Sequence, residues 1–152
     1  MPSRLWRVTT EDKKLFLTFD DGPIPGLTEW VLDVLTQYDA KATFFCVGAN
    51  VEKHPMILQR MVNEGHAVGN HTQNHLNGWE TPLKTYVENV SLCQQSFQKQ
   101  GQSTQLFRPP YGRLRWQQRQ QLGDLKVVMW DVLSKDYVQT LAADTVLKES
   151  IK

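Results

Sequence analysis

The sequence predicts a single α/β domain in which helices cover a parallel sheet. Short apolar segments typical of buried strands alternate with longer segments of helical periodicity, and no Gly-, Ser- or Pro-rich linker divides the 152 residues. Strand–helix–strand units of this kind connect parallel strands by right-handed crossovers. A barrel and an open sheet fit this alternation equally well.

Four segments are expected to form buried strands, because short continuous apolar runs are typical of the strands of parallel sheets. They span residues 15–19, 42–47, 67–70 and 125–130. The first ends at Asp20 and Asp21, which are followed by the turn-forming pair Gly22 and Pro23. The third runs directly into His71.

The first expected helix begins near Thr28, whose side chain can cap its amino end. Its apolar face is predicted by helical spacing, which relates Val31, Val34, Leu35 and Tyr38. A second helix is expected between Pro55, which suits a first turn, and Gly65, which suits a carboxyl-terminal cap.

Three more helices are expected towards the end of the chain. Thr81 and Pro82 open a long one, whose apolar face is formed by Tyr86, Val90, Cys93 and Phe97. The next covers residues 113–122 and is closed by Gly123. The last covers residues 141–151.

Charge and hydropathy argue against several classes of protein. A formal net charge of +1 disfavours a nucleic-acid-binding protein, and no run approaches the ~18 apolar residues of a transmembrane helix. Residues 1–6 lack the apolar region of a signal peptide. As written, the chain is therefore expected in the cytoplasm, or in the envelope or outside the cell if residues precede Met1. Cys46 and Cys93 are expected to be small core residues.

Polar clusters follow the expected strands, where parallel sheets usually place their chemistry. The first is the pair Asp20 and Asp21. Adjacent carboxylates alternate direction along an extended backbone, so one can bind a metal ion while the other takes a proton. The alternative is an ordinary turn in which one aspartate caps a helix.

The second cluster contains His71 and His75. This spacing places both imidazoles on one side of a helical turn, where they can share a cation. Two histidines and one carboxylate form a facial set that leaves coordination positions open for water and substrate. Two unrelated surface histidines are the alternative.

The third cluster spans residues 107–113, in which two prolines fix the backbone and remove two N–H donors. The amides of Tyr111 and Gly112 become candidate donors to a developing oxyanion, and Arg108 can fix a neighbouring carboxylate. The alternative is a rigid loop with a surface arginine.

The fourth cluster follows the last expected strand. Asp131 and Asp136 are equally placed candidate acids. Trp130 and Tyr137 fit either the core or the floor beneath a sugar ring, and the core is favoured because aromatic side chains dominate core burial.

In three of these segments the sequence resembles the polysaccharide deacetylases of carbohydrate esterase family 4, which share the NodB homology domain. The segments are residues 18–23 (TFDDGP), 71–75 (HTQNH) and 108–112 (RPPYG). The resemblance extends from Leu15 to Tyr137 and implies one domain over residues 1–152. It also implies the α/β fold of this family, a distorted (β/α) barrel.

The resemblance implies a role for each matching residue. Asp21, His71 and His75 correspond to the ligands of a divalent metal ion, most simply Zn²⁺, with Co²⁺ and Ni²⁺ as alternatives. Asp20 corresponds to the general base and Arg108 to the residue that holds it. The implied reaction removes acetyl groups, mainly N-acetyl, from an oligo- or polysaccharide by attack of a metal-bound water that Asp20 activates.

The remaining implied site residues bind substrate or orient other groups. The backbone amide of Tyr111 corresponds to the oxyanion donor, and Pro110, Tyr111 and Trp130 to the substrate surface. Asp136 corresponds to the acid that orients a catalytic histidine. The fourth motif departs from the family, because Leu133 replaces an acid and Tyr137 replaces a tryptophan.

No histidine follows His75, whereas the family has a fifth motif with a histidine that protonates the leaving amine. The domain is therefore expected to lack its last strand and fifth motif, so the barrel is incomplete at the carboxyl terminus and activity is weak or absent. The alternatives are a non-catalytic glycan-binding or structural remnant and a hydrolase of small non-sugar amides. Arg113, Arg115 and Arg119 suit a solvated helix face better than an anionic glycan. The sequence leaves the oligomeric state open.

Overall fold

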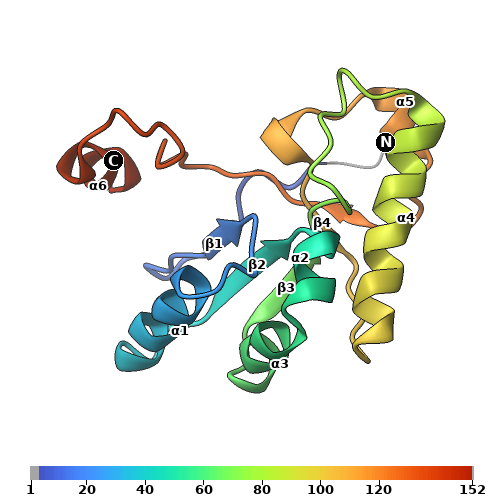
Figure 1. Cartoon of the computed structure of the whole chain (residues 1–152). Coiled ribbons are helices and arrows are strands. Elements are labelled where there is room, and N and C mark those ends of the chain that lie inside the picture. The colour runs from blue at the N-terminus through green and yellow to red at the C-terminus, as the bar shows by residue number, and fades with distance from the viewer. Residues whose placement is uncertain (1–3, 152) are drawn as a thin grey trace.

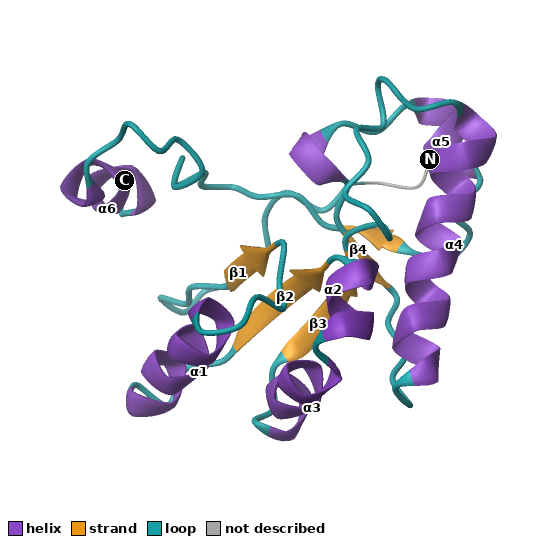
Figure 2. Cartoon of the chain, in the orientation of Figure 1, coloured by secondary structure: helices purple, strands orange, loops and turns teal. Residues whose placement is uncertain are grey.

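The protein is described from a computed structural model, and the description covers residues 4–151. Its centre is a parallel sheet of five strands, which lie side by side in the order in which they occur along the chain (Figures 1 and 2). The strands are β1 (Leu17–Asp20), β2 (Ala42–Cys46), β3 (Ala67–Asn70), β4 (Leu106–Phe107) and β5 (Lys126–Val127). The predicted α/β class with a parallel sheet is therefore confirmed.

Seven helical segments connect and follow these strands. They are α1 (Leu27–Gln37), α2 (Gly48–Lys53), α3 (Pro55–Asn63), α4 (Leu83–Lys99), the 3₁₀ turn η1 (Pro110–Gly112), α5 (Trp116–Gln120) and α6 (Ala143–Ser150). Because every strand pair is parallel, the carboxyl ends of the strands meet at one edge of the sheet, and the loops that follow them lie together.

Two apolar clusters hold the helices on the sheet. The larger joins α1, α3 and α4 to the central strands through Leu32, Phe44, Leu58, Met61 and Phe97, all nearly free of solvent contact. The smaller joins the other end of α4 to β4 and β5 through Tyr86, Val90, Phe107 and Val127. The predicted apolar face of α4, including the buried Cys93, is confirmed.

The expected burial of the first strand is wrong. Leu15 is 88% exposed, and Phe16 and Leu17 are also exposed. The cause is the position of β1, which pairs only with β2 within residues 4–151 and forms one edge of the sheet. The apolar run therefore predicts the strand correctly here but does not predict that its side chains are buried.

The amino end of α1 also differs from the expectation. The helix begins at Leu27, and the cap is Gly26, whose N–H donates to the Glu29 carboxylate at 2.8 Å. The hydroxyl of Thr28 instead accepts the Ile24 N–H. The buried face comprises Thr28, Leu32 and Leu35, whereas Tyr38 is exposed.

Several elements are shorter than expected or have no sequence signal. The segment after β3 that carries His71 and His75 is a loop, and α5 and β5 cover only part of the ranges 113–122 and 125–130. The short elements α2 and β4 lack a run long enough to show periodicity. Val128 continues β5 by a single parallel bridge to Leu5, near the amino terminus.

The chain leaves the sheet after Trp130 and ends in α6, which stands apart from the other elements in Figure 1. None of the residues of α6 is buried. Within the described part of the chain, no helix is long and apolar enough to cross a membrane.

Candidate metal centre and active site

Three of the four polar clusters meet at the carboxyl edge of the sheet. Asp20 ends β1 and Asp21 follows it, His71 follows β3, and Arg108 follows β4. The loops after β1, β3 and β4 thus meet at this edge, so that Asp20 and Arg108, 88 positions apart in sequence, come into contact.

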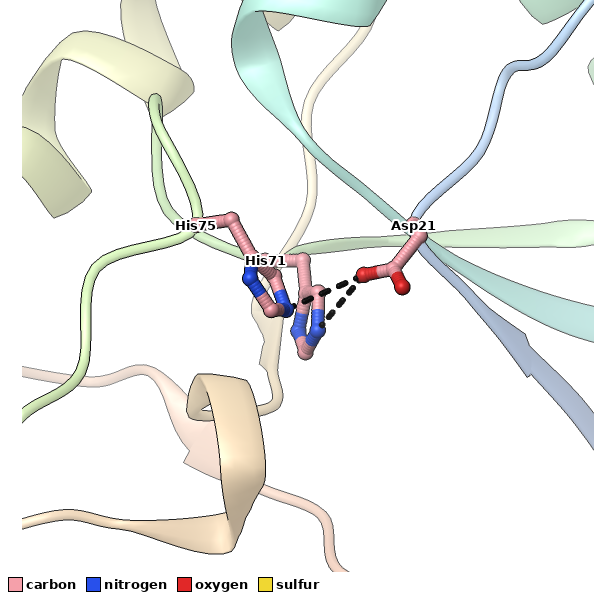
Figure 3. Close-up of side chains that lie close together, drawn as sticks. All are labelled: Asp21, His71 and His75. Carbon is pink, nitrogen blue, oxygen red and sulfur yellow. Dashed lines mark ion pairs between the residues drawn. The ribbon is translucent and has the colours of Figure 1, made fainter. Parts of the chain in front are cut away.

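Asp21, His71 and His75 form a compact cluster (Figure 3). Asp21 Oδ1 lies 3.1 Å from His75 Nε2 and 3.5 Å from His71 Nε2. The imidazole of His71 is buried, whereas His75 and Asp21 are partly open to solvent. The two imidazoles hold the pKa of the Asp21 carboxyl well below its usual range, mainly by hydrogen bonding to the carboxylate. The cluster thus combines a carboxylate with two imidazoles and keeps an open side.

The backbone that presents these ligands is not a helical turn, so that expectation is wrong. Residues 71–75 form a loop, in which Thr72 has φ 64° and His75 φ 54°. Asp21 has φ 69°. Non-glycine residues rarely adopt this left-handed conformation, and it is concentrated at functional sites because surrounding contacts must hold it.

The cluster fits a divalent metal ion. His71 Nδ1 lies 2.7 Å from the carbonyl oxygen of Arg108, and because a carbonyl only accepts, Nδ1 must donate. The nitrogen left to bind a metal ion is then Nε2, which faces Asp21. Carboxylate oxygen and imidazole nitrogen suit zinc and other first-row ions, and three protein ligands leave room for further coordination.

Asp20 is held by Arg108. Arg108 Nη1 donates to Asp20 Oδ1 at 2.7 Å and to Thr18 Oγ1 at 2.8 Å. The guanidinium is buried and also donates to the carbonyls of Val128 and Met129. Two adjacent carboxylates thus have separate surroundings, one beside a buried cation and the other beside two imidazoles.

The loop after β4 brings Tyr111 to the cluster. The Tyr111 ring is exposed and meets the His75 ring at 4.7 Å between centroids. The Gly112 N–H donates to the Pro109 carbonyl at 3.0 Å, so this amide is not the free donor that was expected. The Tyr111 amide, at φ 59°, remains the candidate donor.

Pro110 belongs to this loop, and Trp130 packs against it. Pro110 is buried, so its contribution to a substrate surface would come through the backbone that it fixes. Trp130 is half-buried and packs on Gly112, where an added Cβ would lie 2.7 Å from the indole ring. Its ring also lies 5.7 Å from the Arg108 guanidinium carbon. Trp130 therefore supports the loop that carries Tyr111.

Apart from Trp130, no hydrogen bond, ion pair or ring contact joins the described residues of the fourth cluster to this site. Asp136 is exposed and accepts a hydrogen bond from Ser134 Oγ at 2.6 Å. Asp131 pairs with Arg7. Tyr137 is 68% exposed on the segment that leads to α6.

Asn89 is a site residue that the sequence analysis missed. It lies on the buried face of α4, and its Oδ1 accepts the N–H groups of Gln73 and Asn74 at 2.9 and 3.0 Å. Both amides belong to the loop that carries His71 and His75. Its sequence position offered one signal, because Asn89 falls on the apolar face of a predicted helix. A polar side chain buried there needs a hydrogen-bond partner.

Replacing Asn89 by alanine is expected to weaken zinc affinity about 10- to 100-fold, because the loop loses the acceptor that fixes two of its amides. Asn89→Asp keeps an acceptor oxygen and should recover most of the affinity. Asn63→Ala, at an exposed position of α3, is the control. Zinc titration against a competing chelator measures the difference, and an unchanged affinity in Asn89→Ala contradicts the assignment.

Comparison of this chain with known proteins identifies its family. Residues 7–130 match the family model described as polysaccharide deacetylase. A peptidoglycan-N-acetylglucosamine deacetylase from Bacillus cereus is 38% identical over 136 residues, which are 86% of this chain and 48% of that protein. A chitooligosaccharide deacetylase from Rhizobium leguminosarum bv. trifolii is 47% identical over 66 residues, which are 43% of this chain and 31% of that protein.

A solved structure gives the same result for the fold. Peptidoglycan deacetylase PdaC from Bacillus subtilis superposes with a TM-score of 0.86 at 35% identity, covering 93% of this chain and 70% of that one. The expected deacetylase-type (β/α) fold is confirmed. The chain spans about half the length of the Bacillus cereus protein. Because the family model covers most of its residues, the chain belongs to the polysaccharide deacetylase family.

Proposed function

We propose that this chain carries the metal-binding and water-activating site of a carbohydrate deacetylase, which hydrolyses acetyl groups, mainly N-acetyl, on an oligo- or polysaccharide. One observation carries the proposal: Asp20 and Asp21 are adjacent, yet Asp20 is held by Arg108 while Asp21 faces His71 and His75. A metal-dependent hydrolase needs this division between a carboxylate ligand and a carboxylate base.

Asp21, His71 and His75 are the proposed ligands of a divalent ion, most simply Zn²⁺, with Co²⁺ and Ni²⁺ compatible with the same donors. When bound, such an ion supplies positive charge that acidifies water and polarises a carbonyl oxygen. The buried imidazole of His71 is oriented for this role by the Arg108 carbonyl.

Asp20 is the proposed general base, which accepts a proton at its carboxylate from the attacking water. Arg108 fixes the orientation of that carboxylate through a charge-assisted hydrogen bond, leaving the second oxygen to receive the proton. The Tyr111 N–H is the proposed donor to the developing oxyanion.

The proposed substrate surface is the exposed side of the loop after β4, where the Tyr111 ring lies beside His75. The loop is fixed by Pro110 and by Trp130, which packs on Gly112. Asp136 remains a proposed catalytic acid from the resemblance. The relatives' printed names favour acetylated peptidoglycan or chitooligosaccharide as the substrate class.

The test is acetate release by the zinc-loaded chain from N-acetylglucosamine oligomers and from peptidoglycan fragments. Asp20→Asn is expected to lower the rate about 10²- to 10⁴-fold while zinc content stays the same, because only proton transfer is lost. Asp33→Asn, in an exposed ion pair on α1, is the control. Full activity in Asp20→Asn contradicts the role of Asp20. Absence of acetate release by the zinc-loaded parent favours a non-catalytic remnant.

A further inference from the structure

An arginine lies between two exposed aromatic rings beside the metal cluster. The Arg113 guanidinium carbon is 5.1 Å from the centroid of the Trp79 ring and 5.9 Å from that of the Tyr111 ring. The Tyr111 ring in turn contacts His75. Four side chains from the loops after β3 and β4 therefore form a continuous strip, which leads from a proposed metal ligand to the surface.

The strip is open to solvent. Trp79 is 57% exposed and Tyr111 60% exposed. Large exposed aromatics gathered at one place are typical of a binding surface rather than of scattered surface residues. Cation–π contact with both rings limits the positions that the guanidinium can adopt.

The hydrogen-bonding capacity of Arg113 is not used within residues 4–151. No described group accepts a hydrogen bond from its guanidinium, and its nearest acid, Glu80 Oε1, lies 3.6 Å away. That pair is exposed, and exposed ion pairs contribute little because water competes for both charges. A guanidinium has five donors in a planar fork, which matches the two oxygens of a carboxylate.

The charge around the strip favours an anion. A second guanidinium, that of Arg115, donates to the backbone carbonyl of Trp79, so two cations and the carboxylate of Glu80 lie at this end of the strip. The two aspartates of the site already face other groups, Arg108 and the two histidines.

We propose that Arg113 is a specificity-determining residue that selects acetylated glycans bearing a carboxylate close to the reacting acetyl group. This inference rests on the proposed function and deepens it. One sugar ring stacks on Tyr111 or Trp79, and Arg113 binds the carboxylate through two N–H groups, displacing Glu80. Neutral glycans stack on the same rings without that ion pair.

The test compares dissociation constants of the full zinc-loaded chain for two tetrasaccharides of equal length. One is the neutral N-acetylglucosamine oligomer, and the other alternates this sugar with one that carries a lactyl carboxylate. The parent is expected to bind the acidic tetrasaccharide about tenfold more tightly, as expected for a hydrogen-bonded charge pair. The preference should decline with added NaCl.

Arg113→Gln is expected to reduce the preference for the acidic over the neutral tetrasaccharide to within about twofold. Arg113→Lys keeps the charge without the planar fork and should retain part of the preference. Lys41 directly precedes β2, at the amino ends of the strands and therefore away from the site. Lys41→Gln removes an equal charge there and should leave the preference unchanged. Zinc content shows that each variant is folded at the site.

The carboxylate that Arg113 binds could belong to the sugar itself or to a peptide attached to it. A third ligand, which carries a peptide on the lactyl carboxyl, distinguishes these two sources. Preference for the unmodified acidic sugar assigns the carboxylate to the sugar, and preference only for the peptide form assigns it to the peptide. Equal affinity for all three ligands, or a preference that survives in Arg113→Gln, overturns the inference. Selective binding without acetate release contradicts only the proposed function, since binding requires no turnover.

Discussion

Replacing Arg108 by methionine is expected to lower the free energy of unfolding by about 3 kcal/mol. The guanidinium is buried and satisfies four acceptors, which are Asp20, Thr18 and the carbonyls of Val128 and Met129. Methionine preserves much of the volume above the Phe45 ring, where the guanidinium carbon lies 4.2 Å from the centroid. The loss is therefore one of charge and hydrogen bonding.

Urea unfolding measures this change, and Arg7→Met is the matched control. Arg7 pairs with Asp131 at the surface, so its removal should cost less than about 1 kcal/mol. Asp20→Asn, which keeps an acceptor for Arg108, should be milder than Arg108→Met. If Arg108→Met is as stable as the Arg7 variant, Arg108 does not hold the carboxyl edge of the sheet together.

Removing any one of Asp21, His71 and His75 by alanine substitution is expected to reduce zinc affinity by more than about 100-fold. The effect should exceed the usual cost of altering a residue that only orients a ligand. A bound ion also stabilises the folded chain, by about 2.7 kcal/mol when free zinc is 100 times the dissociation constant.

Metal content after dialysis and thermal unfolding with and without a chelator measure both effects. The parent should lose stability on chelation, whereas the three variants should not respond. His54→Ala, which removes a histidine outside the cluster, should behave as the parent does. A parent that holds no zinc, or variants that retain it, contradict the proposed ligand set.

The fold could be predicted where sequence periodicity reports burial directly. The apolar stripe of α4 and the strands β2 and β3 are examples, because their side chains face a continuous core. Leu15, Phe16 and Leu17 have the same apolar character but lie at the sheet edge. Hydrophobicity alone carries no information about what covers a strand.

The site could be predicted only in part, because its residues have different kinds of sequence signal. His71 and His75 stand out by spacing, although a loop with positive φ angles, not a helical turn, brings them together. Asn89 binds backbone amides of the loop that carries the histidines, and contacts of this kind have no fixed separation along the sequence. The Trp79–Arg113 contact likewise depends on how two loops pack.

The three candidate ligands lie within residues 21–75, whereas the groups that hold them come later in the chain. Arg108 orients both Asp20 and His71, and Asn89 fixes the loop between the histidines. During synthesis, the ligands therefore leave the ribosome before their supports. An ion bound to the nascent half should gain affinity as α4 and β4 dock, and by reciprocity it should strengthen that docking. Bound zinc would thus stabilise the packing of residues 83–108 against the part of the chain that carries the ligands.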